Sequence, residues 1–353
     1  MRYGKTRKNI LSNEDIFAGA SETMTAKKRI LSGMRPTGKL HLGHLVGALD
    51  NWVKLQDTYH CFYMIADWHA LMSEYADPKD IRENSYAIVK DFVAAGLDPE
   101  KSVIFIQSHV PEHLELYMVF SDLTPLGWVE RCPTYKEQLR EIKGRDLTTY
   151  GFLGYPVLQA ADIALYKADT VPVGVDQLPH LELTREIVRR FNTIYGKNVF
   201  PEPEGLLTKI PKLLGLDNRK MSKSYENFIS LSDEPADISK KVSAMITDPS
   251  RIKLKDAGHP DVCNVFNYYS IFAPPGSLAL IKDWCEGASK GCTECKEGLA
   301  KILTERLRPM SLKRAKLSND DVKDILKTGA KKARDVAGQT MAAVRSLIHF
   351  AQE

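Results

Sequence analysis

"KRILSGMRPTGKLHLGHLVGALDNW", residues 28–52, passes from a short apolar strand pattern through a turn into an amphipathic helix pattern. The strand pattern covers residues 28–33, and apolar residues recur at close to helical spacing between 43 and 56. His41 and His44 lie in the turn, on either side of Gly43. A strand, a turn and a helix form the first unit of a parallel α/β sheet, and such sheets bind ligands beyond the carboxyl ends of their strands. We therefore expect this turn to face a ligand.

The same alternation continues through the first two thirds of the chain. Strand patterns cover 61–67, 102–107 and 170–174. Helix patterns cover 78–96, 111–123, 155–168 and 176–196, and Asp176 is expected to cap the last of these. The alternation predicts an α/β fold with a Rossmann-like doubly wound parallel sheet.

These patterns divide the chain into four segments. Residues 1–28 predict a flexible N-terminal extension, and 29–205 predict the Rossmann-like domain. Residues 206–232 predict a loop and linker. Strand patterns end at about residue 233, so 233–353 predict a C-terminal helical domain whose last helix, about 331–350, packs back on the core. A length of 353 residues agrees with two domains.

Composition and charge exclude several protein classes. The chain is 43% hydrophobic and 27% charged, which is typical of a globular protein and excludes extensive disorder. No apolar run is long enough to cross a membrane, and the basic start lacks the apolar region of a secretion signal, so we expect a cytoplasmic protein. The net charge is only +4, so binding of a polyanion needs a local patch, such as the lysines and arginines of residues 301–334.

A second motif offers groups that suit a triphosphate. "KMSKS", residues 220–224, places two lysines and two serines after a stretch that contains proline and glycine. The helix that follows the first strand offers N–H groups to phosphate oxygens, and Gly43 lets a nucleotide approach the backbone. Neither a GxGxxG fingerprint nor a Walker A motif is present. The two motifs therefore predict a nucleotide site of another kind.

The combination of HLGH (41–44) with KMSKS (220–224) resembles the class I aminoacyl-tRNA synthetases. With "YPVLQAADIALYKAD" (155–169) and "VPVGVDQLPHLELTREIVRRFN" (171–192), the chain is similar to the bacterial tryptophanyl-tRNA synthetases from about residue 29 to its C-terminus. The resemblance implies that ATP, with Mg²⁺, activates L-tryptophan to tryptophanyl-adenylate with release of pyrophosphate. The tryptophanyl group then passes to tRNA(Trp), and the resemblance implies a homodimer.

The resemblance also implies roles for single residues. Asp162 would accept the indole N–H of the substrate, and Tyr155 and Gln177 would hold its amino group. For ATP, the resemblance implies catalytic contacts from His41, His44, Lys220 and Lys223, and binding contacts from Gly43, Lys136, Asp176, Met221, Ser222 and Ser224. From the residues alone, a carboxylate in the apolar run around Asp162 needs a hydrogen-bond donor, which comes either from a ligand or from another side chain.

Three alternative functions remain open at this level. A tyrosyl-tRNA synthetase shares the class I core, and a phenol O–H is as much a donor to Asp162 as an indole N–H is. A nucleotidyltransferase also carries HxGH, although it does not require KMSKS. A synthetase-like paralogue with a regulatory, RNA-binding or metal-sensing role is the third.

Four of the six cysteines form one closely spaced series in the predicted helical domain: Cys263, Cys285, Cys292 and Cys295. In a reducing compartment such a series indicates metal ligation rather than disulfides. Four thiolates suit either an iron–sulfur cluster or a tetrahedral zinc ion. The spacing resembles that of a subset of bacterial tryptophanyl-tRNA synthetases, which implies a [4Fe–4S] cluster, with Zn²⁺ as the alternative.

Overall fold

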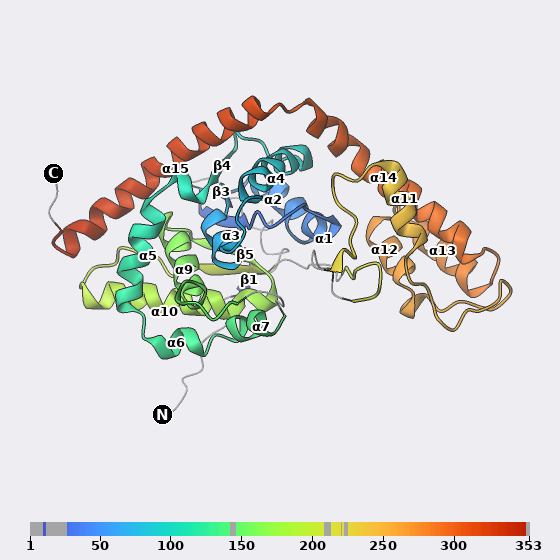
Figure 1. Cartoon of the computed structure of the whole chain (residues 1–353), viewed down its shortest axis with the longest axis horizontal. Helices are drawn as coiled ribbons and strands as arrows, with labels where there is room; N and C mark the ends of the chain where they lie inside the picture. Colours follow the sequence, from blue (N-terminus) through green and yellow to red (C-terminus); the bar gives the residue numbers. More distant parts are fainter. Residues whose placement is uncertain are drawn as a thin grey trace, which may run out of the picture.

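The computed structural model describes residues 10–11, 27–141, 146–207, 213–219, 221 and 225–350. Its central element is a parallel sheet with the strand order β1-β6-β5-β2-β3-β4. The strands are β1 (Ile10–Leu11), β2 (Arg29–Met34), β3 (His60–Ile65), β4 (Ser102–Ile106), β5 (Thr170–Val173) and β6 (Glu204–Leu207). This sheet confirms the predicted Rossmann-like fold (Figure 1).

The order of the strands creates a switch point in the sheet. From β2 the chain moves outward through β3 to β4, and it then returns to the other side of β2 with β5 and β6. Crossovers therefore leave β2 and β5 in opposite directions, which opens a crevice beyond their carboxyl ends. In folds of this kind, ligands bind at that crevice.

Helices cover both faces of the sheet, because alternate strand residues are apolar on both sides. Tyr63 and Ile65 of β3 belong to one core, and Phe62 and Met64 belong to the other. The helices of the sheet domain are α1 (Leu42–His44), α2 (Asp50–Leu55), α3 (Asp67–Glu74), α4 (Ile81–Ala95), α5 (Glu112–Leu123), α6 (Leu126–Glu130), α7 (Pro133–Glu141), α8 (Tyr150–Leu153), α9 (Tyr155–Leu165) and α10 (Leu178–Ile194).

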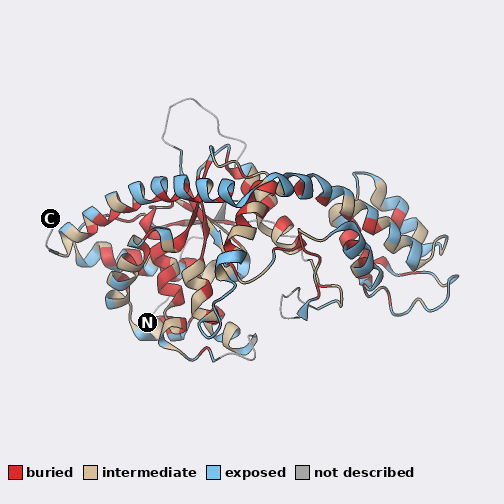
Figure 2. Cartoon of the chain, turned by 45° about the horizontal axis from the view of Figure 1, so that its top comes forward, coloured by how far each residue is buried: buried red, intermediate tan, exposed pale blue. Residues whose placement is uncertain are grey.

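A helical region follows the sheet domain, as the sequence predicts. It consists of α11 (Pro235–Ser243), α12 (Asn264–Phe272), α13 (Ser277–Glu286), α14 (Cys292–Lys316) and α15 (Asn319–Leu347). In Figure 1, α11 to α14 form a separate lobe, and α15 returns along the sheet domain. The inward face of α15 is buried and its outward face is exposed (Figure 2).

α15 passes from one core of the protein to the other across the edge strand β4. Its early residues Val322 and Leu326 join the first core, and the later residues Ala337 and Met341 join the second. Gly329 lies at the crossing, where a Cβ atom would come within 1.8 Å of the Ile104 carbonyl oxygen. The helix therefore covers an edge that would otherwise present unpaired backbone groups.

The structure corrects several predicted boundaries. The helix expected at 43–56 contains a π-helical segment, Leu45–Leu49, between α1 and α2. α10 begins at Leu178, and its N-cap is Gln177, so Asp176 does not cap it. The last helix begins at Asn319 rather than near 331. The strand β6 and the helices α3, α6, α7 and α8 have no counterpart in the sequence prediction.

Of residues 1–26, the structure describes only Ile10–Leu11, which pair in parallel with Gly205 and Leu206 of β6. The predicted flexibility of the N-terminal extension therefore stays a prediction. Within the described part of the chain, no helix combines the length and apolarity that a membrane crossing requires.

Candidate active site

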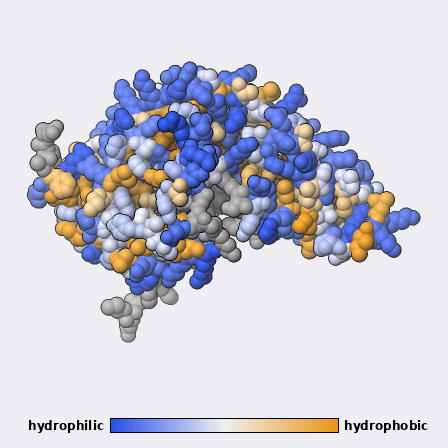
Figure 3. Space-filling model, viewed as in Figure 1, coloured by the Kyte–Doolittle hydropathy of each residue, from blue (hydrophilic) through white to orange (hydrophobic). Residues whose placement is uncertain are grey.

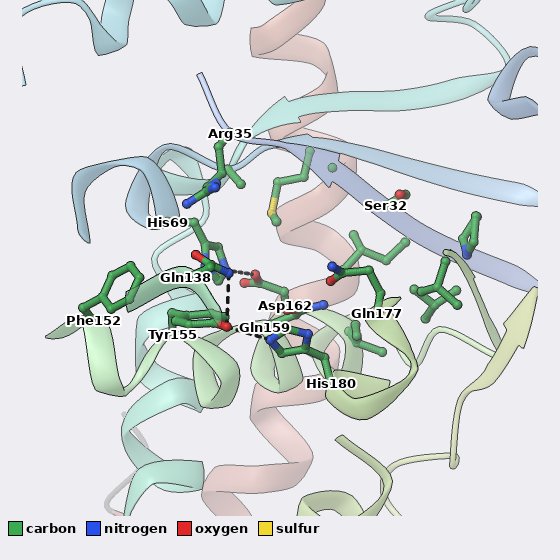
Figure 4. A pocket seen from close by; sticks show the side chains of 18 residues that line it. Ser32, Arg35, His69, Gln138, Phe152, Tyr155, Gln159, Asp162, Gln177 and His180 are labelled. Atoms are coloured by element: carbon green, nitrogen blue, oxygen red, sulfur yellow. Dashed lines mark hydrogen bonds and ion pairs between the residues drawn. The ribbon is translucent and has the colours of Figure 1, made fainter. Parts of the chain in front are cut away.

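A cavity of about 370 Å³ lies at the switch point of the sheet, a volume in the usual range for small-molecule sites. β2 and β5 supply residues to its wall on one side, and α3, α7, α9 and the start of α10 supply most of the polar groups. Its polar lining residues are Ser32, Arg35, His69, Gln138, Tyr155, Gln159, Asp162, Gln177 and His180 (Figure 4). The predicted substrate residues Asp162, Tyr155 and Gln177 therefore lie around one cavity.

Asp162 is the only carboxylate that lines this cavity among the described residues, and it is 2% exposed. Its Oδ1 atom accepts from Gln107 Nε2 at 2.8 Å and lies 2.6 Å from His113 Nδ1. Its Oδ2 atom lies 2.8 Å from His69 Nε2 (Figure 4). Burial on its own raises the pKa of Asp162, but the charge and hydrogen bonds of His113 and His69 outweigh it and lower the pKa to about 2. The carboxylate is therefore ionised at neutral pH.

A second set of polar side chains surrounds the Tyr155 hydroxyl. His180 Nε2 lies 3.0 Å from this oxygen, and Gln138 Nε2 donates to it at 3.2 Å. His180 is also 2.9 Å from the Thr134 hydroxyl. Burial, followed by the charge of His69, lowers the pKa of His180 to about 4, so this ring is neutral at pH 7. A neutral ring beside the cavity does not repel an ammonium group.

The HLGH turn consists of α1 and its N-cap His41. His41 is 9% exposed, and its ring centroid lies 3.8 Å from that of His44. The backbone N–H of His41 donates to His44 Nδ1 at 3.2 Å. Because Nδ1 accepts, the proton of a neutral His44 ring is on Nε2. A Cβ atom on Gly43 would lie 3.0 Å from the His41 ring, so the turn packs closely at this position.

The chain that follows the KMSKS motif is paired with the HLGH turn. Leu42 N–H donates to the Ile229 carbonyl at 3.1 Å, and Leu231 N–H donates to the Leu40 carbonyl at 3.0 Å. Within the motif the structure describes Met221, whose Sδ atom would lie 3.3 Å from a Cβ atom on Gly43. Lys220, Ser222, Lys223 and Ser224 lie outside the described residues. The roles predicted for their side chains therefore stay predictions.

None of the predicted ATP residues that the structure describes lines this cavity; they are His41, Gly43, His44, Lys136, Asp176 and Met221. Lys136, on α7, is exposed, and Gln138 from the same helix lines the cavity instead. Asp176 is exposed and accepts from Gln177 Nε2 at 3.1 Å. Their predicted contacts with ATP stay predictions.

The sequence analysis did not identify His69, Gln107, His113 or His180 as site residues. A usable signal was present for two of them: His69 lies in the first turn after β3, and Gln107 follows β4 directly. Both therefore come from the carboxyl edge of the sheet, where ligands bind. His113 and His180 lie within helices, and only the packing of α5 and α10 against α9 reveals them.

The four cysteines of the helical region line one small, mainly apolar cavity together with Val265, Ile281 and Trp284. Burial and the nearby Cys263 raise the pKa of Cys295 to about 11. A Cβ atom on Gly258 would lie 2.4 Å from Cys285 Sγ, so the chain approaches this sulfur closely. Within the described residues, no three His, Cys, Asp or Glu side chains are gathered around a position for a single ion.

The basic stretch 301–334 makes specific contacts as well as exposing charge. Arg306 Nη2 lies 2.7 Å from Asp50 Oδ1, and Arg314 Nε lies 2.7 Å from Asp91 Oδ1. These two arginines connect α14 to helices of the sheet domain. Besides Arg306, the basic residues that stay exposed are Lys301, Arg308, Lys313, Lys316, Lys323, Lys327, Lys331, Lys332 and Arg334.

Comparison with known sequences gives a consistent result. A family model described as "tRNA synthetases class I (W and Y)" matches residues 23–308. A tryptophan–tRNA ligase of Thermotoga maritima is 51% identical over 326 residues, which cover 91% of this chain and 99% of the relative. A tryptophan–tRNA ligase of Aquifex aeolicus is 42% identical, with coverage of 91% and 100%.

Solved structures show the same relationship. A tryptophanyl-tRNA synthetase of Campylobacter jejuni, in complex with ADP and tryptophan, is 33% identical, with a TM-score of 0.84 and coverage of 91% of this chain and 100% of that one. A tyrosyl-tRNA synthetase of Archaeoglobus fulgidus, in complex with L-tyrosine, is 22% identical with a TM-score of 0.63, which shows a shared fold alone.

Proposed function

Because the chain belongs to the class I tRNA synthetases of the tryptophan and tyrosine family, we propose that the cavity at its switch point binds L-tryptophan and that the HLGH and KMSKS motifs bind ATP beside it. The chain is an aminoacyl-tRNA synthetase and acts as a tryptophan–tRNA ligase. The observation that carries the site assignment is the buried, ionised Asp162 in a cavity that opens at the switch point.

Recognition of the substrate follows from the chemistry of the cavity. The indole N–H donates to Asp162 Oδ2, which receives one protein donor, His69, and retains an acceptor position. The polar groups around Tyr155 and Gln177 receive the ammonium group, and the neutral His180 ring beside them adds no positive charge. A buried acceptor rejects an amino acid that lacks a matching donor by roughly 10⁴ to 10⁵, so phenylalanine is excluded without an editing step.

The first step joins the two substrates without a covalent enzyme intermediate. A carboxylate oxygen of tryptophan forms a bond to the α-phosphorus of ATP, and the bond to the bridging oxygen of pyrophosphate breaks with its electron pair. The chain positions the reacting atoms and stabilises charge on the phosphates. His44 donates from Nε2, His41 lies against it, and Lys220 and Lys223 supply ammonium groups. Loss of one such donor costs about 10²- to 10³-fold in rate.

The other ATP contacts are proposed on the same basis. Gly43 lets the nucleotide approach the turn, Met221 packs against Gly43, and Ser222 and Ser224 offer hydroxyls. Asp176 contacts the ribose, and Lys136 reaches the triphosphate. Mg²⁺ neutralises phosphate charge when it is bound, and phosphate oxygens and water supply most of its ligands.

In the second step a terminal ribose hydroxyl of tRNA(Trp) takes the tryptophanyl group. The exposed lysines and arginines of 301–334 are proposed to contact the phosphates of the tRNA, with binding that weakens as salt rises. Reversal of charge at Lys327 and Lys331 is expected to reduce the affinity for tRNA, and unchanged affinity would refute this contact. A cytoplasmic location is proposed together with this activity.

Cys263, Cys285, Cys292 and Cys295 are proposed to hold a [4Fe–4S] cluster, as in a subset of the family. The four cysteines line one cavity. A zinc ion would bind all four thiolates at one centre, whereas each cysteine of a cluster binds its own iron. The cluster would supply cross-linking of α13 and α14 rather than catalysis. Equal amounts of iron and acid-labile sulfide in anaerobically purified protein would support this, and bound zinc alone would refute it.

A homodimer is proposed on surface grounds as well as by family. Met118 on α5 and Leu126 on α6 are each 59% exposed, although both are large and apolar. Hydrophobic side chains also gather on this side of the molecule in Figure 3. Contact with a second copy would remove such side chains from water. Light scattering at micromolar concentration should give twice the mass of the chain, and a strict monomer would contradict the proposal.

ATP–pyrophosphate exchange tests the activation step. The chain is expected to exchange label when L-tryptophan is present, and to give only background exchange with L-tyrosine or with no amino acid. Asp162→Asn serves as a matched variant, because its amide no longer offers two acceptor oxygens, and it should raise the KM for tryptophan more than the KM for ATP. Exchange supported by tyrosine alone, or by neither amino acid, would overturn the proposed function.

A further inference from the structure

We propose that His113 is a positioning residue for substrate specificity: it fixes Asp162 so that Oδ2 is presented to the N–H of an indole. This inference rests on the proposed function, and it goes beyond it by assigning the selectivity for that N–H to a residue outside the cavity lining. Asp162 lines the cavity, whereas His113 lies behind it on α5 and has no exposed surface.

The two oxygens of Asp162 have different surroundings. Oδ1 receives both Gln107 and His113, at 2.8 and 2.6 Å, which uses the two acceptor positions of one carboxylate oxygen. Among the described residues, Oδ2 receives His69 alone, at 2.8 Å. His69 lines the cavity, so Oδ2 is the oxygen on the cavity side and it retains one acceptor position. A ligand N–H can be accepted there without displacing a protein donor.

His113 is itself held at both ring nitrogens. Nδ1 faces Asp162 Oδ1, and an ionised carboxylate only accepts, so Nδ1 carries a proton. Nε2 lies 2.8 Å from the Tyr166 hydroxyl, and Tyr166 is fully buried against the second core. Tyr166 therefore fixes the plane of the imidazole, and the imidazole fixes the plane of the carboxylate. The aromatic contact of His113 with Phe105, at 6.0 Å between ring centroids, limits its movement further.

The same contacts keep the carboxylate ionised despite its burial. Burial favours the protonated form of a carboxyl that is 2% exposed, and a protonated oxygen would be a donor rather than an acceptor. The attraction and hydrogen bond of His113 are the largest influences that lower the pKa of Asp162. Loss of His113 would thus weaken the hydrogen bond from the indole N–H to Oδ2, because the carboxylate would lose both its fixed orientation and part of its ionised population.

The test compares tryptophan with 3-(3-benzothienyl)alanine, which has the same ring shape with sulfur in place of the N–H group. In ATP–pyrophosphate exchange, the ratio of kcat/KM for the two amino acids measures recognition of the N–H. His113→Phe removes both hydrogen bonds and is expected to lower this ratio at least about tenfold, mainly through the KM for tryptophan. His113→Asn places an amide N–H where Nδ1 was, and it should restore most of the ratio.

Two further variants keep the test decisive if His113→Phe folds poorly. Tyr166→Phe keeps the ring and removes the hydroxyl that holds His113 Nε2. It should lower the ratio of kcat/KM for the two amino acids about threefold to tenfold. Phe120→Leu disturbs the second core from the same helix through its ring contacts with Phe191 and Phe200, and it should reduce stability while the ratio stays unchanged. The inference is overturned if His113→Phe or Tyr166→Phe lowers kcat/KM for both amino acids equally, or changes neither. A wild-type chain that activates neither amino acid would instead contradict the proposed function.

Discussion

At the scale of single residues, His180 shows how burial sets the charge in the site. It is 2% exposed, and burial lowers its pKa from 6.5 to about 4. Between these values the unfolded chain binds a proton that the folded chain does not, so stability falls as the pH falls from about 6.5 to about 4. The folded protein should therefore lose about 2 kcal/mol of stability from this group between pH 7 and pH 5.

Urea unfolding at these two pH values checks this expectation. The control is His180→Gln, which cannot titrate, and its free energy of unfolding should fall by about 2 kcal/mol less than that of the wild type over the same interval. Equal losses of stability in the two proteins would show that folding does not lower the pKa of His180.

Gly43 is expected to matter for ATP rather than for stability. An alanine Cβ would lie 3.0 Å from the His41 ring and 3.3 Å from Met221 Sδ, so it would push the two motifs apart. Misplacement of catalytic groups by a fraction of an ångström to 1 Å costs up to about 10²-fold. Gly43→Ala should therefore lower kcat/KM for ATP about tenfold to a hundredfold, with little change in Tm. Gly151→Ala is the matched control, because its Cβ would meet no atom within 4 Å.

The site residues that sequence could identify are those whose chemistry is visible in a short motif. Asp162 stands out because a carboxylate in an apolar helix needs a donor. Its actual donors, His69, Gln107 and His113, come from three different elements, and no local pattern joins them. Long-range packing therefore decides whether protein or ligand donors bind the carboxylate of Asp162. The structure shows that protein donors occupy most of its acceptor positions.

At the scale of elements, the packing of α15 on β4 depends on the close contact between Gly329 and the backbone of Ile104. A Cβ atom on Gly329 would lie 1.8 Å from the backbone oxygen of Ile104, which cannot move without distorting β4. Gly329→Ala should therefore cost about 3 kcal/mol as the helix is forced away from the strand. Gly338 lies on the same helix and its Cβ would meet nothing within 4 Å, so Gly338→Ala should stabilise the protein by about 0.5–1 kcal/mol. Urea unfolding of both variants measures the difference in their stability. Similar changes in the two variants would contradict the close contact of Gly329 with β4.

Strong periodic elements were predictable and short ones were not. β2, β3, β4 and β5, and the helices α4, α5, α9 and α10, follow apolar patterns of the right period. β6 is a strand of four residues that include a glutamate and a glycine, and its pairing with β5 and β1 makes it a strand. α15 extends further toward the N-terminus than predicted, because Ser318 forms a capping box with Asp321 that was not recognised.

At the scale of the whole molecule, two ion pairs connect α14 to the sheet domain with different energetic weight. Asp91 is 3% exposed, and burial raises its pKa to about 6 despite its contact with Arg314. The pair is therefore ionised at pH 7.5, and Arg314→Leu would leave a buried charge without its partner. This variant should lose about 2–4 kcal/mol of stability at that pH.

Arg306→Leu is the matched control on the same helix. The side chains of Arg306 and Asp50 are 42% and 37% exposed, so solvent screens their attraction and the loss should stay below about 1 kcal/mol. The two variants should thus differ clearly in the midpoint of urea unfolding. Equal midpoints would contradict the different burial of Asp50 and Asp91.

The division into a sheet domain and a helical region was predictable because strand patterns stop near residue 233. The contacts between the two parts were not predictable. In the sequence, Arg306 and Arg314 look like ordinary solvent-exposed charges on a helix. The same limit applies to the cysteines: spacing placed them in one series, and the folding of α13 and α14 brought them to one cavity.

The central claim is that the HLGH turn and the KMSKS segment act on one ATP molecule beside the tryptophan cavity. A structure of the chain with L-tryptophan and a non-hydrolysable ATP analogue tests it most directly. The account predicts that the triphosphate lies within hydrogen-bonding distance of His44 Nε2 and of the ammonium groups of Lys220 and Lys223, about 3 Å. An analogue bound at the turn with both lysines beyond reach of its phosphates, or bound elsewhere on the chain, would contradict the account.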